Sequence, residues 1–147
     1  MYKHILLPTD GSELSDKAVE HGLDFAQAVN ARVTLLHVVP EFRVGHDEAI
    51  AARSPDLKKR FEQEARKRAE KMLGVVGKKA AAKGVKCATL SAANDAPFQQ
   101  IIATAKQQKC DLIIMASHGR RGLAGILLGS ETAKVLTHST IPVLVVR

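Results

Sequence analysis

Apolar residues along this chain fall into two arrangements, short continuous runs and longer stretches with a helical period. Continuous apolar runs of this length are typical of strands that are buried on both faces of a parallel sheet. The runs predict five strands, over residues 2–8, 32–40, 85–91, 111–117 and 141–147.

The stretches between the runs repeat their apolar residues every three or four positions, which places those residues on one face of a helix. This spacing predicts helices over residues 12–30, 55–84 and 130–137, and another that begins at Pro97. Ser12 or Ser15 is expected to cap the first helix, and Asn30 to close it in a left-handed conformation. The second helix carries a long apolar stripe, formed by Leu57, Phe61, Ala65, Ala69, Leu73, Val76 and Ala80.

Residues 41–54 have no clean period. We interpret them as a loop, with a helical turn near residues 47–52. The role of this segment stays open between a lid, an interface and a plain connection.

Strands alternate with helices throughout the chain, a pattern typical of a parallel sheet with helices on both faces. We therefore predict an α/β fold with a doubly wound five-stranded parallel sheet in the order 3-2-1-4-5, as a single domain over residues 1–147. Pro142 favours an edge position for the last strand, because proline cannot donate a hydrogen bond to a ladder.

Charge and composition narrow the function classes. The net charge is +7, but residues 55–84 hold ten Lys or Arg and four acids, so one helix carries a net +6. A charge-rich helix is more often a solvated face than a binding stripe. Aromatic residues, on which single-stranded nucleic acid stacks, are only 3% of the chain, so we expect no nucleic-acid partner. No apolar run approaches the roughly 18 residues that span a bilayer, so we expect a cytoplasmic protein without membrane contact.

Cys87 and Cys110 stand 23 positions apart with no C-x-x-C pair, and the histidines are scattered. This spacing argues against a disulfide and against a metal site. Each cysteine lies at the edge of a predicted strand, where it is expected to behave as a small core residue.

The loop between the fourth strand and the last helix is rich in glycine. It contains Gly119, Gly122, Gly125 and Gly129. A glycine-rich loop before a helix N-terminus lets backbone N–H groups surround an anion, and Ser130 at the helix start adds a hydroxyl. This pattern predicts a phosphate site. Arg120 and Arg121 either add positive charge to it or are only solvated.

The predicted strand order gives this loop a neighbour. The winding of the sheet reverses between the first and fourth strands, and ligands of doubly wound sheets bind at that crevice. Residues 8–11, which follow the first strand, should therefore meet residues 116–119, which follow the fourth.

Three stretches resemble the universal stress protein family: PTDGS near the start, LHVV in the second strand and MASHGRRGLAGILLGSE near the end. The resemblance runs from Met1 to Arg147 and is unclear only over residues 41–54. Nucleotide-binding members carry G-x-x-G, nine residues and then G-[ST]. Gly119, residues 120–128 and Gly129 with Ser130 match the second part, whereas Ala116 replaces the first glycine. Alanine costs little there if the backbone is extended.

The resemblance implies an adenine nucleotide alpha hydrolase-like fold that binds ATP, with Mg²⁺ held mainly by the phosphates. The implied site residues are Pro8, Thr9 and Asp10 beside the nucleotide, Val38 at the adenine, Met115, Ala116, His118 and Gly119 along the ribose and phosphate path, and Gly129, Ser130, Glu131 and Thr132 at the phosphates; Arg120 is added for its charge. Asp10 either contacts the nucleotide, directly or through Mg²⁺, or caps the turn before the first helix. His118 either donates to a phosphate or is structural. No residue is assigned a catalytic role.

Members of that family pair as homodimers, often through the last strand. The apolar run over residues 141–147 supports such pairing independently. An unpaired apolar edge strand is an aggregation hazard, and pairing with a second copy removes the edge.

Two functions stay open. The first is an ATP-binding, dimeric stress-response regulator with at most slow ATP hydrolysis, because the chain has no Walker G-x-x-x-x-G-K-[ST] loop and no obvious general base beside the glycines. The second is a dimeric stress or signalling module of the same fold that does not bind nucleotide and works through protein contacts; Ala116 is its only support. A nucleotidyl-transferring enzyme is disfavoured because the chain lacks an H-x-G-H type signature. A phosphoacceptor receiver domain is disfavoured as well, because it would need an acid pair after the first strand and a lysine after the fifth.

Overall fold

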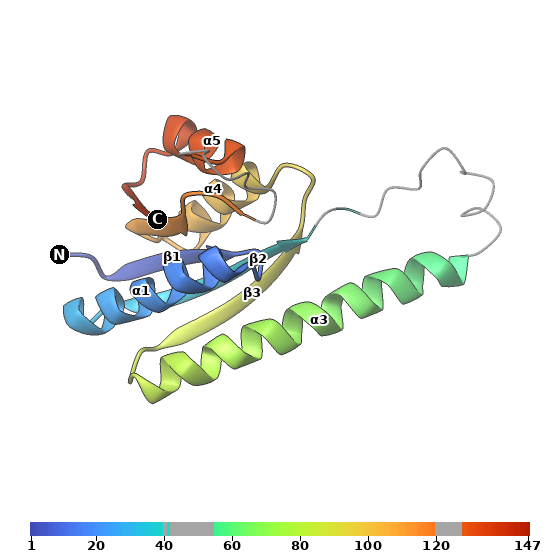
Figure 1. Cartoon of the computed structure of the whole chain (residues 1–147), viewed down its shortest axis with the longest axis horizontal. Helices are drawn as coiled ribbons and strands as arrows, with labels where there is room; N and C mark the ends of the chain where they lie inside the picture. The colour runs from blue at the N-terminus through green and yellow to red at the C-terminus, as the bar shows by residue number, and fades with distance from the viewer. Residues whose placement is uncertain (40, 42–54, 120–127) are drawn as a thin grey trace.

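The computed structural model describes residues 1–39, 41, 55–119 and 128–147. The predicted helical turn near residues 47–52 lies outside these residues, as do Arg120, Arg121, Gly122 and Gly125. In chain order the elements are β1 (His4–Thr9), α1 (Glu13–Val29), β2 (Arg32–Val39), α3 (Pro55–Ala82), β3 (Cys87–Ala93), α4 (Pro97–Gln107), β4 (Leu112–Ala116), α5 (Ser130–His138) and β5 (Val143–Val146) (Figure 1).

The five strands form one parallel sheet in the order β3-β2-β1-β4-β5, which confirms the predicted topology. The central strand, β1, pairs Thr9 with His37 of β2 and Leu6 with Ile113 of β4. β3 and β5 are the edges, so the edge position predicted for the last strand is also confirmed. The winding reverses between β1 and β4, so the loops that leave these two strands are neighbours.

Each face of the sheet is covered by two helices. Side chains alternate between the two faces along every strand, so a separate core forms on each face. On one face, α1 and α3 enclose a core built around Ile5, Leu7, Leu23, Leu35 and Leu73. On the other face, α4 and α5 enclose a second core built around Leu6, Leu36, Ile101, Ile113 and Val135. Within the described part of the chain, no helix is both long and apolar enough to cross a membrane.

The predicted ends of the first helix are confirmed. The Ser12 hydroxyl accepts a hydrogen bond from the Ser15 backbone N–H at 3.3 Å and so caps α1. Asn30 closes the helix with φ 55° and ψ 44°, and its N–H donates to carbonyl groups of the last turn. The Ser15 hydroxyl in turn donates to the Ser12 carbonyl at 3.0 Å.

Helix α3 is longer than the part of the sheet that it covers (Figure 1). Its C-terminal half buries Ala69, Leu73, Val76 and Ala80 against the sheet. In its N-terminal half, by contrast, Leu57 and Phe61 are each 53% exposed. The apolar stripe predicted from the sequence is therefore a core face only from Ala69 onward. The N-terminal part of α3 extends past the ends of β2 and β3, so the sheet does not cover it (Figure 1).

Both thiols are free, and Cys110 is buried. Burial, reinforced by the Asp111 carboxylate, raises the pKa of Cys110 to about 11. Burial also raises the pKa of the half-buried Cys87. Both groups are therefore thiols at neutral pH and poor nucleophiles, in keeping with the packing role expected from the sequence.

A buried polar pair, His4 and Thr34, joins β1 to β2 at the end of the sheet opposite the loops that follow β1 and β4. His4 is 6% exposed and its Nε2 lies 2.8 Å from the Thr34 hydroxyl, while its buried Nδ1 has no hydrogen-bond partner among the described residues. Burial lowers the pKa of His4 from 6.5, and the Arg32 charge lowers it further. The Gln108 backbone and the Asp111 carboxylate oppose this shift. His4 is thus held in the neutral form.

This placement predicts how stability depends on pH. Below pH 6.5 the unfolded chain takes up a proton at His4 while the folded chain does not, so the free energy of unfolding should fall as the pH falls from 6.5 toward the lowered folded pKa. Urea unfolding between pH 7.5 and 5 measures this slope. His4→Gln should flatten it, whereas His21→Gln, on an exposed position of α1, should leave it unchanged. An equal slope in the wild type and His4→Gln would contradict the assignment.

Candidate functional site

The loops that follow β1 and β4 come together as the strand order predicts. A Cβ atom added to Gly119 would clash with Oδ2 of Asp10. Residues more than a hundred positions apart are therefore in contact across the point where the winding reverses. This is the crevice in which ligands of open α/β sheets bind.

The β1–α1 loop is held by hydrogen bonds within the chain. Thr9 is 6% exposed, and its hydroxyl lies 3.0 Å from the Ser15 hydroxyl and accepts from the Gly11 N–H at 3.1 Å. Oδ1 of Asp10 accepts from the Ser12 N–H at 2.9 Å. Asp10 therefore caps the turn, one of its two expected roles, while Oδ2 lies toward Gly119. Pro8 is buried beneath this loop.

The end of β4 carries the one departure from the nucleotide-binding signature. Ala116 is the last residue of the strand, is 7% exposed and pairs with Val146 of β5. It is not among the described residues with positive φ. The extended backbone that alanine needs at this position is therefore present. Met115, directly before it, is also buried, on the α4/α5 face.

Helix α5 begins in direct contact with this strand end. The Gly129 N–H donates to the Ser117 carbonyl at 2.7 Å, and the Thr132 hydroxyl donates to the Ala116 carbonyl at 2.9 Å. A Cβ on Gly129 would lie 2.9 Å from both Cα and Cβ of His118. Glycine is thus required here for the approach of one chain segment to another.

The first turn of α5 presents backbone N–H groups toward its N-terminal end. Its N-cap is Gly129, and no side chain in the described residues caps it. The first N–H groups of a helix have no intrahelical acceptor, and the helix dipole favours negative charge there. Ser130 is exposed at this end. The group that fits such donors is a phosphate.

The other expected site residues differ in what they face. His118 is half-buried, and its Nδ1 lies 3.1 Å from the Ser117 hydroxyl. Val38 of β2 is half-buried and packs against the α4/α5 core. The Glu131 carboxylate is directed to α4, where it accepts a hydrogen bond from the Phe98 N–H at 2.9 Å. Arg120 lies outside the described residues.

Sequence reasoning missed His37, which lies beside the crevice. Its Nδ1 is 2.9 Å from the Thr9 carbonyl oxygen. A carbonyl can only accept, so Nδ1 carries the proton. The feature that could have identified His37 is the register of the two strands, because parallel pairing of β1 with β2 places His37 opposite Thr9.

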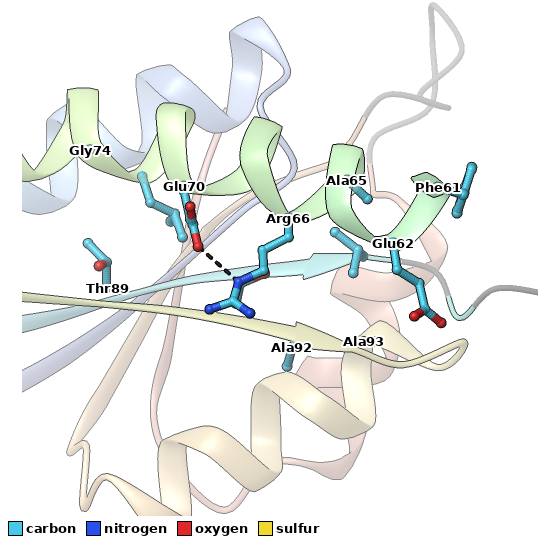
Figure 2. Close-up of a pocket in the computed structure, with 12 residues that line it drawn as sticks. Phe61, Glu62, Ala65, Arg66, Glu70, Gly74, Thr89, Ala92 and Ala93 are labelled. Carbon is cyan, nitrogen blue, oxygen red and sulfur yellow. Dashed lines mark hydrogen bonds and ion pairs between the residues drawn. The ribbon is translucent and has the colours of Figure 1, made fainter. Parts of the chain in front are cut away.

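A groove also runs between α3 and β3 (Figure 2). It is lined by Val39, Phe61, Glu62, Ala65, Arg66, Glu70, Leu73, Gly74, Thr89, Ser91, Ala92 and Ala93. None of the expected site residues lines it. Its charged groups are paired on α3, since Arg66 Nε donates to Glu70 at 2.9 Å and Glu62 pairs with Lys58. No group of three or more metal-ligating side chains occurs in the described parts of the chain.

The fold is a doubly wound α/β architecture whose winding reverses between β1 and β4, the adenine nucleotide alpha hydrolase-like fold. The universal stress protein family model matches residues 1–147, so the chain belongs to the universal stress protein family.

Relatives agree with this assignment. The universal stress protein MJ0531 of Methanocaldococcus jannaschii is 36% identical over 100% of this chain and 83% of its own length. The structure of MJ0577 from the same organism is similar with a TM-score of 0.84 at 32% identity, covering 99% of this chain and 96% of that one. A universal stress protein solved in complex with cAMP has a TM-score of 0.68 at 24% identity, covering 99% and 97%; this likeness extends to the fold alone.

The close approach at Gly129 yields a stability prediction. Gly129→Ala should lower the free energy of unfolding by roughly 1–3 kcal/mol, the usual cost of overpacking, because the new Cβ meets backbone atoms. Urea unfolding measures it. Gly74→Ala, inside α3, is the matched control, because a Cβ at that position would meet nothing within 4 Å. Alanine in place of glycine should raise the free energy of unfolding there by about 0.5–1 kcal/mol. Equal stability of Gly129→Ala and wild type would show that α5 starts elsewhere.

Proposed function

We propose that this universal stress protein binds ATP in the crevice between the β1–α1 loop and the first turn of α5, and acts as a dimeric stress-response regulator. The observation that carries the proposal is the uncapped first turn of α5, fastened to the end of β4 by Gly129 and Thr132. Its backbone donors form the proposed anion site, and Asp10 approaches Gly119 at the neighbouring strand end. A universal stress protein of this fold has been solved with cAMP, so an adenine ligand is within the chemistry that the fold accepts.

The triphosphate is assigned to the N-terminus of α5, with Gly119 giving room where a Cβ would meet Asp10. Ser130 supplies a hydroxyl, and Val38 contacts the adenine through its backbone. Mg²⁺ held mainly by the phosphates completes the proposed ligand, and Asp10 is the carboxylate assigned to contact it. The proposal is nucleotide binding with at most slow hydrolysis.

Ala116 was the only support for a module without nucleotide. Its extended backbone is one that alanine adopts readily, so the conformational objection to binding does not apply at this position. No contact among the described residues favours that alternative.

Nucleotide binding is tested by denaturing the purified protein, identifying any released adenine nucleotide, and titrating ATP calorimetrically with and without Mg²⁺. We expect heat of binding that strengthens with Mg²⁺. Gly119→Val should reduce affinity at least about tenfold, because the added side chain would keep the phosphates from the backbone donors and so cost at least one hydrogen bond to a charged group, with the fold retained by circular dichroism. No bound nucleotide and no heat at millimolar ATP would leave the protein-contact module as the surviving function.

The dimer is proposed to form through β5. The carbonyl groups of Pro142 and Val146 accept from the Ile113 and Ser117 N–H groups of β4. Since backbone groups alternate along a strand, the N–H and carbonyl groups of Val143 and Val145 face outward from the sheet edge. The side chains of β5 are half-exposed.

Val145→Pro removes an outward N–H without touching a bond to β4, so it should convert a dimer to a monomer. Light scattering of the wild type and variant measures this. Val145→Thr is the matched control, because it keeps the shape and the N–H and should remain dimeric. A monomeric wild type, or a dimeric Val145→Pro protein, would rule out this interface.

A further inference from the structure

Helix α4 begins without a cap from its own N-cap residue. Ala96 has no side-chain acceptor, and Pro97 occupies the start of the helix. The first N–H that needs an acceptor, that of Phe98, donates instead to Oε2 of Glu131 at 2.9 Å. The cap of α4 therefore comes from the first turn of α5.

The second carboxylate oxygen of Glu131 is also engaged. Lys134 Nζ donates to Oε1 at 2.9 Å and lies 5.4 Å from the centroid of the Phe98 ring. His138 also packs against this cluster, with its ring centroid 5.3 Å from that of Phe98. The Glu131 side chain is 35% exposed. Four residues thus join the two helices on one face of the sheet.

The position of Glu131 in α5 gives this cluster its significance. Glu131 directly follows Ser130, and its neighbour Thr132 bonds to the Ala116 carbonyl. The Thr132 side chain therefore fastens the first turn of α5 to β4, and the Glu131 side chain fastens the same turn to α4. An acid in this turn would repel a phosphate if its carboxylate faced the crevice. The N-terminus of α4 and Lys134 instead hold the carboxylate in a favourable place.

We propose that Glu131 is a positioning residue for the phosphate site rather than a ligand of the nucleotide or its metal ion. By capping α4 it fixes the direction of the first N–H groups of α5. This inference rests on the proposed ATP binding and assigns to Glu131 a different role from the one that the family resemblance implied.

The test compares ATP with adenosine, because adenosine lacks the phosphates that α5 would hold. Dissociation constants are measured calorimetrically with Mg²⁺ for the wild type, Glu131→Ala and Glu131→Gln. Glu131→Ala should weaken ATP binding by about three- to tenfold, the size expected from the loss of one capping bond, and leave adenosine unchanged. Glu131→Gln should bind ATP nearly as the wild type does, since its amide oxygen still accepts from Phe98.

Glu70→Ala is the charge-matched control. Glu70 is an exposed acid paired with Arg66 on α3, and its removal should not change the ratio of ATP to adenosine affinity. Equal ATP affinity of Glu131→Ala and wild type would overturn the positioning role. Equal losses in Glu131→Gln and Glu131→Ala would overturn it as well, because they would point to a direct carboxylate contact.

Amide hydrogen exchange separates this inference from the proposed function. Without any nucleotide, Glu131→Ala should accelerate exchange at Phe98 and in the first turn of α5, and Glu131→Gln should not. A wild type that shows this exchange pattern but binds no ATP would refute the proposed function and leave the link between α4 and α5 in place. Unchanged exchange in Glu131→Ala would refute the link itself.

Discussion

The contact between Gly129 and the end of β4 sets the geometry on which the candidate site depends. The Gly129 N–H reaches the Ser117 carbonyl at 2.7 Å, and the His118 backbone fills the space where a Cβ would stand. Because helix N–H groups point along the helix axis, the place where α5 starts also fixes where its unpaired donors point. A shift of this contact would move the anion site as a unit, whatever the side chains around it.

Most polar side chains at the crevice serve the chain itself. Thr9 bonds to Ser15, Asp10 caps its own turn, and Thr132 holds α5 to β4. These side chains fix the positions of the loop and helix backbone, so the donors left for a ligand in the proposed site are mainly backbone N–H groups. A site of this kind depends on loop geometry more than on individual functional groups. Ala116 is in keeping with such an arrangement, because its extended backbone requires no glycine.

The strand and helix pattern was sufficient to predict the fold, because continuous apolar runs alternate with helical stripes everywhere except over residues 41–54, where no clean period occurs. It failed for the N-terminal half of α3, since periodicity shows which face is apolar but not how far the sheet beneath it extends. It placed Asp10 and Gly119 together through topology alone. It could not foresee the side chain of Glu131, whose acceptor role is decided by a neighbouring helix 33 positions earlier. His37 was within reach, but only once the register of β1 and β2 was considered.

A signature match alone is weak support for nucleotide binding when its residues have other reasons to be present. Gly129 is needed for close approach, and Thr132 and Glu131 each hold α5 to a neighbouring element. Ser130 is different: it is exposed, and its side chain makes no hydrogen bond with the described residues. Among the hydroxyl and carboxyl side chains at the start of α5, Ser130 is thus the one that hydrogen bonding within the described residues does not explain.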